Sequence, residues 1–267
     1  MAASSSEPPL LEVSVPHHAP PINPDEDLLA SFVYPQTPQQ FLARHYCSSA
    51  VAWRGGGSAR LRHILDDFLH AGSTSALVRE TASEAVHCWL KREASALPGE
   101  ASSERLDSLK LEDGAQALTA HAAGASLYMR APQEMHDVFV PALTDCLGMA
   151  WGGYYDPERA QPTGEIEVFV SRPGHTTDWH TDFQQNFTVQ LRGRKRWCFR
   201  RSRVPAAPRA ITPHFVVGTD VVEQQVKLQR LRDPDFAFGG PPSAAAAPEV
   251  SVVLEPGDLL YFPAGMW

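Results

Sequence analysis

The spacing of apolar residues changes near residue 164, from helix-like intervals to strand-like alternation. Before that point, apolar residues recur every three or four positions, as at Leu61, Ile64, Leu65 and Phe68. After it, the segment EIEVFVSRPG alternates between apolar and polar residues, and short apolar runs are separated by turns. A repeat of 3.6 residues is typical of amphipathic helices and a repeat of two is typical of strands. The pattern therefore predicts helices first and antiparallel strands afterwards.

The first half of the chain carries one clear helix start. Thr37, Pro38 and Gln40 supply an N-cap hydroxyl, a proline at the first helical position and a capping-box glutamine. We expect a helix from this point. The other expected elements of this half are a short buried strand over VAWRGGG, helices over residues 60–70, 75–93 and PQEMHDVFVPALTDCLG, and a polar loop over residues 94–113.

Two pairs of strands are predicted near the end of the chain. FTVQLRGRKRWCF reads as two strands around Arg192-Gly193, and VSVVLEPGDLLYFPAG as two strands around Pro256-Gly257. Proline followed by glycine is what a type II turn requires. Between the pairs, residues 203–249 are rich in Pro and Ala and are predicted to form a long inserted loop. The order of elements predicts an α+β protein whose second half is a double-stranded β-helix, a cupin or jelly-roll barrel.

The domain organisation follows from the same pattern. Residues 1–30 are rich in Ser and Pro without sustained periodicity, so they are expected to be a disordered leader. Residues 31–267 are expected to form one domain. Its helical part would cover about residues 37–148 and its barrel part about residues 150–267.

Composition narrows the class of protein. The 267 residues carry a formal net charge of −8, which argues against nucleic acid as the main substrate and against an anionic membrane surface. The four cysteines are far apart and lack C-x-x-C spacing, so a reducing compartment, cytoplasmic or nuclear, is expected. No window approaches about 18 uninterrupted apolar residues, and the first thirty residues contain no Lys or Arg. Neither a membrane span nor a signal peptide is therefore expected.

The pattern H-x-D at His180 and Asp182 indicates a metal site. In a strand, side chains two residues apart leave the same face, so an imidazole and a carboxylate would point to one place. With a second histidine they form the facial triad that binds Fe(II) and leaves positions open for an acid and O₂. Two alternatives remain: Asp178 pairing with His180 as D-x-H, and His175 as a competing ligand. Without a metal, His180 would be a hydrogen-bonded structural residue and Asp182 a surface carboxylate.

The second histidine of such a site is expected from a later strand, and LLYFPAGMW is the candidate. The sequence stops at Trp267, before that strand supplies a histidine. One interpretation is a fragment, C-terminally truncated, in which residue 268 is the missing His. The other is a protein that lacks the ligand and holds iron poorly. An open sheet edge after LLYFPAGMW favours the fragment.

An acid bound to iron at one end needs a cation for its far carboxylate. Lys195 follows the expected hairpin turn, on a strand paired with the one after Asp182, and shares its parity with Trp197 and Phe199. A lysine on an apolar face is costly unless it meets an anion. The alternative is that Lys195 belongs to a solvated hairpin edge with the surrounding arginines. Thr177 and Asn186 offer a hydroxyl and an amide that could bind the acid, or could be ordinary turn and strand residues.

These segments resemble a known family. The stretch HTDFQQNFTVQLRGRKRW is similar to the core signature of JmjC-type 2-oxoglutarate oxygenases, and PGDLLYFPAGMW is similar to the strand that leads into their distal histidine. QQNF followed by Q-x-x-G-x-K-R resembles the hypoxia-inducible-factor asparaginyl hydroxylase. QLRGRKRW, PGDLLYFP and TPQQFLARHYCSSAVAWRGG resemble the ribosomal oxygenases. The resemblance is strongest over residues 174–199 and 254–267.

The resemblance implies roles for particular residues. His180 and Asp182 would bind Fe(II), and Lys195 would hold the distal carboxylate of 2-oxoglutarate. Thr177, Asn186 and, in the strand-like SLYMR, Tyr128 would assist in binding this acid. The chain departs from the ribosomal oxygenases at Ile166-Glu167, where those proteins usually carry an asparagine.

The expected function is an Fe(II)- and 2-oxoglutarate-dependent dioxygenase that hydroxylates a protein side chain, or demethylates it by hydroxylation. Its substrate would be a ribosomal, histone or other protein, and a homodimer is left open by the resemblance. The first alternative is a catalytically inactive cupin-fold binding module that lacks the third metal ligand. A cupin isomerase or sugar-binding enzyme is a further alternative, although such metal sites usually take more histidines from the first strand.

Overall fold

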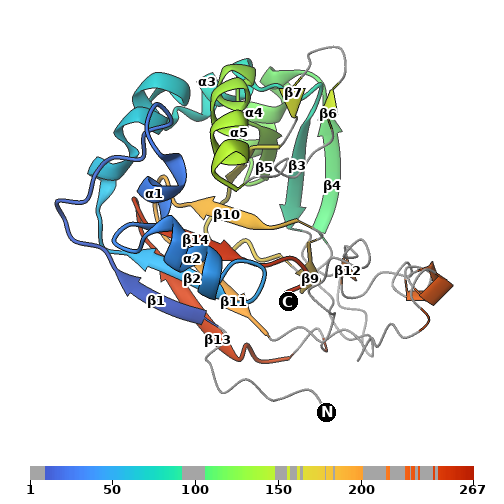
Figure 1. Cartoon of the computed structure of the whole chain (residues 1–267). Helices are drawn as coiled ribbons and strands as arrows, with labels where there is room; N and C mark the ends of the chain where they lie inside the picture. Colours follow the sequence, from blue (N-terminus) through green and yellow to red (C-terminus); the bar gives the residue numbers. More distant parts are fainter. Residues whose placement is uncertain are drawn as a thin grey trace. The chain divides into compact units, whose positions relative to one another are not determined.

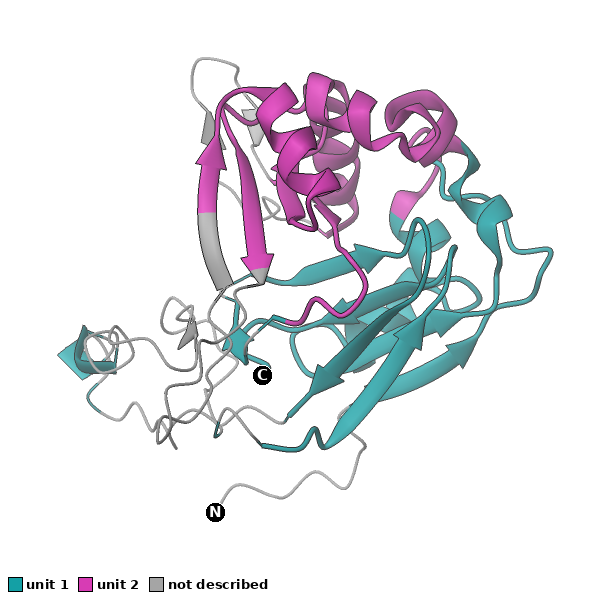
Figure 2. Cartoon of the chain, turned by 180° about the vertical axis from the view of Figure 1, so that it is seen from behind, with its two compact units in different colours: residues 1–23, 29–62, 177–267 teal, residues 24–28, 63–176 magenta. Residues whose placement is uncertain are grey.

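The computed structural model forms two compact units of mixed helix and sheet (Figures 1 and 2). Unit 1 contains Met1–Asn23, Leu29–Arg62 and Thr177–Trp267, and unit 2 contains Pro24–Leu28 and His63–Thr176. None of the helices in the part of the chain that the structure describes has the length and apolarity needed to cross a bilayer. The structure describes residues 10–91, 106–147, 155–156, 161–162, 165–177, 179–182, 184–200, 215–216, 226–228, 230–231, 234, 243 and 246–267.

The larger sheet of unit 1 has four strands in the order β1 (Leu10–Ser14), β2 (Ala50–Arg54), β14 (Leu259–Phe262) and β10 (Asn186–Val189). Strands β1 and β2 are parallel, and the other pairs are antiparallel (Figure 1). The paired strand β1 corrects the expectation of a structureless leader as far as residue 30. This strand, LLEVS, is only five residues long, so its alternation of apolar and polar residues is a weak signal. Its Leu10 nevertheless lies in the core.

Two smaller pairs of strands complete the sheets of unit 1. Strand β11 (Lys195–Phe199) pairs with β13 (Val250–Leu254), and β9 (His180–Thr181) pairs with β12 (Phe215–Val216). Both pairs are antiparallel. Strand β12 falls inside the stretch that was predicted to be an inserted loop, and most of that loop lies outside the described residues.

The four strands around the two predicted turns form, but their partners differ from those expected. Neighbours in sequence lie in different sheets: β10 pairs with β14 and β11 pairs with β13, so neither turn closes a hairpin. The turns lie against each other, because Gln190 N–H donates to Asp258 O and Gly257 N–H donates to Gln190 O, both at 3.0 Å. Alternation identifies a strand, whereas the choice of partner depends on contacts distant in sequence, which is why the pairing was wrong.

The apolar core of unit 1 lies between these two sheets. Strands β2 and β14 contribute from one side, and β11 and β13 from the other. The members of this cluster, called the inner cluster below, are Leu10, Ala50, Ala52, Phe199, Val252, Leu254, Leu260, Phe262 and Met266, with Trp197 and Val250 packed against them.

The opposite face of the larger sheet is covered by two short helices, α1 (Leu28–Val33) and α2 (Pro38–Arg44). Helix α2 begins as predicted, with the complete capping box of Thr37 and Gln40. Its Phe41 packs edge-on against Tyr261 at 4.9 Å between ring centroids. The larger sheet is therefore buried on both faces.

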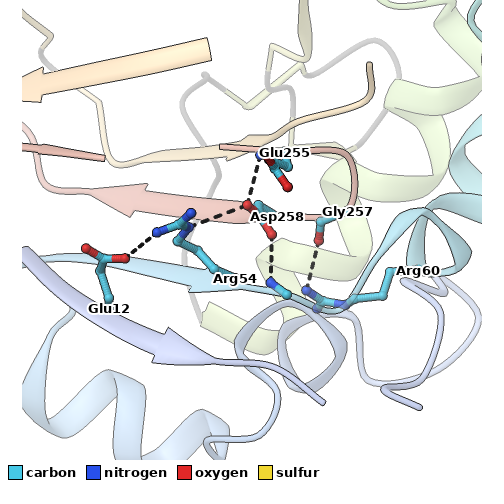
Figure 3. Close-up of polar contacts among 7 residues, drawn as sticks. Glu12, Arg54, Arg60, Glu255, Gly257 and Asp258 are labelled. Atoms are coloured by element: carbon cyan, nitrogen blue, oxygen red, sulfur yellow. Dashed lines mark hydrogen bonds and ion pairs between the residues drawn. The ribbon is translucent and has the colours of Figure 1, made fainter. Parts of the chain in front are cut away.

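A buried carboxylate organises the second turn (Figure 3). Asp258 accepts hydrogen bonds from the backbone N–H groups of Gly55 (2.8 Å) and Glu255 (2.9 Å), and Arg54 Nε lies 3.6 Å from it. The guanidinium of Arg60, which is also buried, donates to Gly257 O at 3.2 Å. Since buried polar groups are costly without partners, these contacts fix the turn against β2 and the segment after it.

We expect Asp258→Ala to destabilise the protein by about 3–5 kcal/mol, because it leaves two backbone donors and a guanidinium without their buried acceptor. The control is Glu12→Ala, which removes the exposed partner of Arg54 and should cost about 0–1 kcal/mol. Urea unfolding of both variants measures the difference. Equal losses in the two variants would contradict the role of Asp258.

Unit 2 contains an antiparallel sheet in the order β4 (Leu106–Leu111), β3 (Val86–Lys91), β5 (Ser126–Arg130) and β8 (Glu167–Val170). Helices α3 (Thr74–Glu80), α4 (Gly114–Ala122) and α5 (Gln133–Leu147) lie beside it (Figure 2). Strand β6 (Tyr155–Asp156) pairs with β7 (Gln161–Pro162) in antiparallel orientation. The predictions of α5 and of a strand over SLYMR are confirmed.

Several predictions for this unit are wrong. The helix expected over residues 75–93 ends at Glu80 and is followed by β3, and β4 replaces the last part of the expected polar loop. Val86 and Cys88 are buried two residues apart, which is a strand pattern that the helical spacing obscured. The single helix expected over residues 60–70 is instead three short turns, Ser58–Leu61, Ile64–Phe68 and His70–Gly72.

A buried histidine connects α5 to the start of β8. The ring of His136 lies with Nδ1 3.1 Å from Pro132 O, and its Nε2 accepts a hydrogen bond from Ile166 N–H at 2.9 Å. This backbone donor requires an unprotonated Nε2, so Nδ1 carries the hydrogen. Burial lowers the pKa of His136 below its ordinary value of 6.5.

This arrangement predicts a loss of stability in mild acid. Below its ordinary pKa the histidine of the unfolded chain takes up a proton that the folded His136 resists, so the free energy of unfolding falls between about pH 7 and about pH 5. In His136→Gln this part of the loss should disappear. Chemical unfolding of both proteins at several pH values measures it, and identical pH dependences would show that His136 does not contribute.

Candidate metal and oxo-acid site

Of the proposed metal ligands in unit 1, His180 begins β9 and Asp182 directly follows the last residue of this strand. Thr181 between them is fully buried, whereas His180 and Asp182 are both half-buried, as the alternation of a strand requires. His180 lies opposite Val216 on β12. The carbonyl of Asp182 accepts a hydrogen bond of 2.8 Å from Gly265 N–H, which ties the H-x-D segment to the chain after β14.

No group of three or more His, Cys, Asp or Glu side chains capable of holding a metal ion occurs among the residues that the structure describes. Two other residues, Asp178 and His175, were alternatives to the H-x-D pair. Asp178 lies outside the described residues. His175 belongs to unit 2, where its ring stacks on Trp89 at 6.2 Å between centroids.

Lys195 lies on the inner face of β11. Trp197 and Phe199 share this face, and Leu254 lies directly opposite Lys195 on β13. The Lys195 Nζ atom is 4.7 Å from the centroid of the Trp197 ring. Burial lowers the pKa of Lys195. The amine is therefore directed toward an apolar region, where its charge is costly.

The neighbouring arginines differ from Lys195. Arg192, Arg194 and Arg196 are all exposed, whereas Lys195 is half-buried. A solvated edge would show the same exposure at every charged position. The lower exposure of Lys195 is therefore explained by its place on the inner face of the strand, and not by its membership of a run of charged residues.

Asn186 faces the same core from the opposite sheet. It lies directly across from Phe262, and residues opposite each other in an antiparallel pair share a face. Phe262 belongs to the inner cluster and contacts Trp197 at 5.5 Å between ring centroids. The Asn186 amide donates to Gln184 O at 3.0 Å. Lys195 and Asn186 are therefore on the two inner faces that enclose one core.

Thr177 and Tyr128 are the remaining two predicted residues. Thr177 is exposed, at the start of the last segment of unit 1. Tyr128 lies on β5 of unit 2, and its hydroxyl donates to Glu167 Oε1 at 2.5 Å. Burial and the neighbouring Glu167 carboxylate raise the pKa of Tyr128.

The sequence did not indicate the role of Tyr261, which fixes the segment after Asp182. Its hydroxyl donates to Gln185 Oε1 at 2.5 Å and accepts from Cys47 N–H at 2.8 Å. Tyr261 is fully buried, and burial raises the pKa of its hydroxyl. The apolar run LLYFPAG identifies a buried strand, but it does not reveal which polar groups meet the hydroxyl.

Comparison with known proteins identifies the class. A family described as "Cupin-like domain" matches residues 100–267, which is more than half of the chain. The chain therefore belongs to the cupin-like domain family. Among solved structures it is similar to Escherichia coli ycfD, with 20% sequence identity and a TM-score of 0.46. That match covers 86% of this chain and 48% of ycfD, so the chain spans about half the length of that protein.

The burial of Lys195 leads to a test of stability. Lys195→Met keeps the length of the side chain and removes the charge, so it should leave the free energy of unfolding unchanged or raise it by about 1 kcal/mol in the absence of any ligand. The control Arg196→Met, on the exposed face of the same strand, should change it by less than about 0.5 kcal/mol. Thermal and urea unfolding compare the two. A large loss in Lys195→Met alone would mean that the amine stabilises the unliganded fold.

Proposed function

We propose that this chain carries the iron and cosubstrate site of an Fe(II)- and 2-oxoglutarate-dependent dioxygenase of the JmjC type. The observation that supports this most is the placement of Lys195, a lysine held among apolar side chains between two sheets. A cation in such a place is expected to meet an anion. The H-x-D pair, in the same unit, supplies an imidazole and a carboxylate of the kind that Fe(II) takes.

The barrel itself is part of the proposal. In a double-stranded β-helix, turns carry the chain from one sheet to the facing one. In support of this proposal, the turn after β10 and the turn after β13 each join strands of two different sheets. In this architecture His180 and Asp182 would hold the metal, and Lys195, with Asn186 opposite, would hold the far carboxylate of the oxo acid. The resemblance to JmjC-type oxygenases also implies contacts of Thr177 and Tyr128 to the acid.

The chemistry divides between metal and protein. Bound Fe(II) would activate O₂, so that one oxygen atom enters the substrate as a hydroxyl group and the other enters succinate, with release of CO₂ from 2-oxoglutarate. The protein would bind and orient the acid, and the apolar inner cluster would exclude water from its far end. Hydroxylation of an N-methyl carbon would release the methyl group as formaldehyde, so hydroxylase and demethylase outcomes share one site.

The substrate class rests on the resemblance to JmjC-type oxygenases. We propose a protein side chain, on a ribosomal, histone or other protein in the cytoplasm or nucleus. The chain's net negative charge of −8 argues against nucleic acid as the main substrate. The homodimer that the resemblance leaves open is also part of this proposal.

One observation favours a second function. The described residues contain no group of three metal ligands, and a facial triad requires three. A cupin-fold binding module without catalysis would need none. The test must therefore measure metal binding directly in the full-length protein.

We expect the full-length protein to bind Mn(II), an O₂-stable substitute for Fe(II), and to bind 2-oxoglutarate in its presence. His180→Ala and Asp182→Ala should weaken Mn(II) binding by more than about 100-fold, beyond the effect of losing an outer-shell partner. The control His175→Ala, which removes the rival histidine, should retain it. Calorimetric titration measures each affinity, and succinate release with Fe(II) measures turnover. If the protein binds neither the metal nor the oxo acid, the dioxygenase proposal is wrong and the cupin-fold binding module remains.

A further inference from the structure

The inner face of β11 contains a second group whose chemistry is unexplained. The indole Nε1 of Trp197 is inaccessible to solvent and has no hydrogen-bond acceptor among the residues that the structure describes. The side chains that pack on this ring, Phe199 and Phe262, carry no acceptor atoms. Val252, directly across on β13, carries none either.

An unpaired indole N–H of this kind is costly. Buried tryptophans usually find an acceptor for this hydrogen, and a buried donor without one costs about 1–3 kcal/mol. Trp53, which is fully buried in the same unit, does have an acceptor, because its indole donates to Gln36 Oε1 at 3.2 Å. The donor of Trp197 therefore indicates an acceptor that the described part of the chain does not supply.

The position of Trp197 narrows the chemistry of that acceptor. Its ring is in contact with the Lys195 amine, 4.7 Å from Nζ to the ring centroid, and both side chains leave the same face of β11. None of the residues of the inner cluster is acidic. An amine beside an indole N–H, within an apolar cluster, is a pair of donors suited to one carboxylate, whose two oxygens can each accept.

We propose that Trp197 is a binding residue for the far carboxylate of the oxo acid, and that its Nε1–H donates to one oxygen while Lys195 binds the other. This inference rests on the proposed function and adds a determinant of specificity to it. An oxo acid that ends in a carboxylate would give the indole N–H its acceptor, whereas one of equal length that ends in a methyl group would leave this donor unpaired. The indole thus makes the site selective for a dicarboxylic oxo acid, because an unpaired buried donor penalises the wrong ligand.

The test compares two acids in the full-length protein loaded with Mn(II). 2-Oxoglutarate carries the far carboxylate, and 2-oxopentanoate has the same five carbons without it. Trp197→Phe removes the N–H and keeps an aromatic ring. It should weaken 2-oxoglutarate about 10- to 100-fold, the effect of losing a hydrogen bond to a charged group, and leave 2-oxopentanoate unchanged.

Two further measurements separate binding from folding. Trp53→Phe, the matched control, should lower the unfolding temperature and retain the full preference for 2-oxoglutarate, because its indole is already paired. Trp197→Phe should keep its affinity for Mn(II), which verifies an intact site. A merely structural role of Trp197 would weaken both acids and the metal together.

The outcomes are distinct. Loss of the preference for 2-oxoglutarate in Trp197→Phe alone supports the inference. An unchanged preference in that variant overturns it and leaves the proposed function intact. If the unaltered protein with Mn(II) binds neither acid, the proposed function fails and the inference fails with it.

Discussion

The pairing of strands across two sheets is the constraint on which unit 1 depends. Because β10 joins β14 and β11 joins β13, strands that follow one another in sequence face each other across a core. This arrangement turns one face of β11 toward the inner cluster and directs Lys195 and Trp197 there. If β10 and β11 had paired with each other as a hairpin, the same side chains of β11 would still share one face. That face would then have no second sheet opposite it. The chemistry proposed for the unit is therefore a consequence of the pairing.

The turns that permit this pairing are held by buried polar groups. Asp258 satisfies two backbone donors, and Arg60 reaches Gly257 from a fully buried position. Gly257 itself has φ +93°, and a Cβ there would approach Gly57 O to 2.0 Å, so another residue does not fit. Two charged side chains and one glycine thus hold the turn between β13 and β14 against the segment that follows β2.

Much of this architecture could be predicted from local patterns. The capping box of Thr37, helix α5 and the alternation of β10, β11, β13 and β14 depend on neighbouring residues, and they form as expected. The same parity placed Lys195 with Trp197. Strands β3 and β4 were missed because each forms only with partners distant in sequence, and the leader was misjudged because β1 is stabilised by pairing with β2.

The polar contacts of the site could not be predicted from the sequence. The H-x-D spacing indicates which side chains share a face, but no pattern indicates that Tyr261 meets Gln185 and Cys47 N–H. Nor does a pattern distinguish the unpaired indole of Trp197 from the paired indole of Trp53. Hydrogen-bond partners join segments far apart in the chain, so they emerge only once the sheets are assembled.

The central claim is that the inner face of β11 binds a carboxylate. Nuclear magnetic resonance of the tryptophan indole N–H groups tests it most directly, with the full-length protein and the diamagnetic ion Zn(II) in place of iron. On addition of 2-oxoglutarate, the account predicts that the Trp197 Nε1–H resonance moves downfield, as a hydrogen bond to a carboxylate requires, while that of Trp53 stays in place. An unmoved Trp197 resonance under conditions where the acid is bound would contradict it.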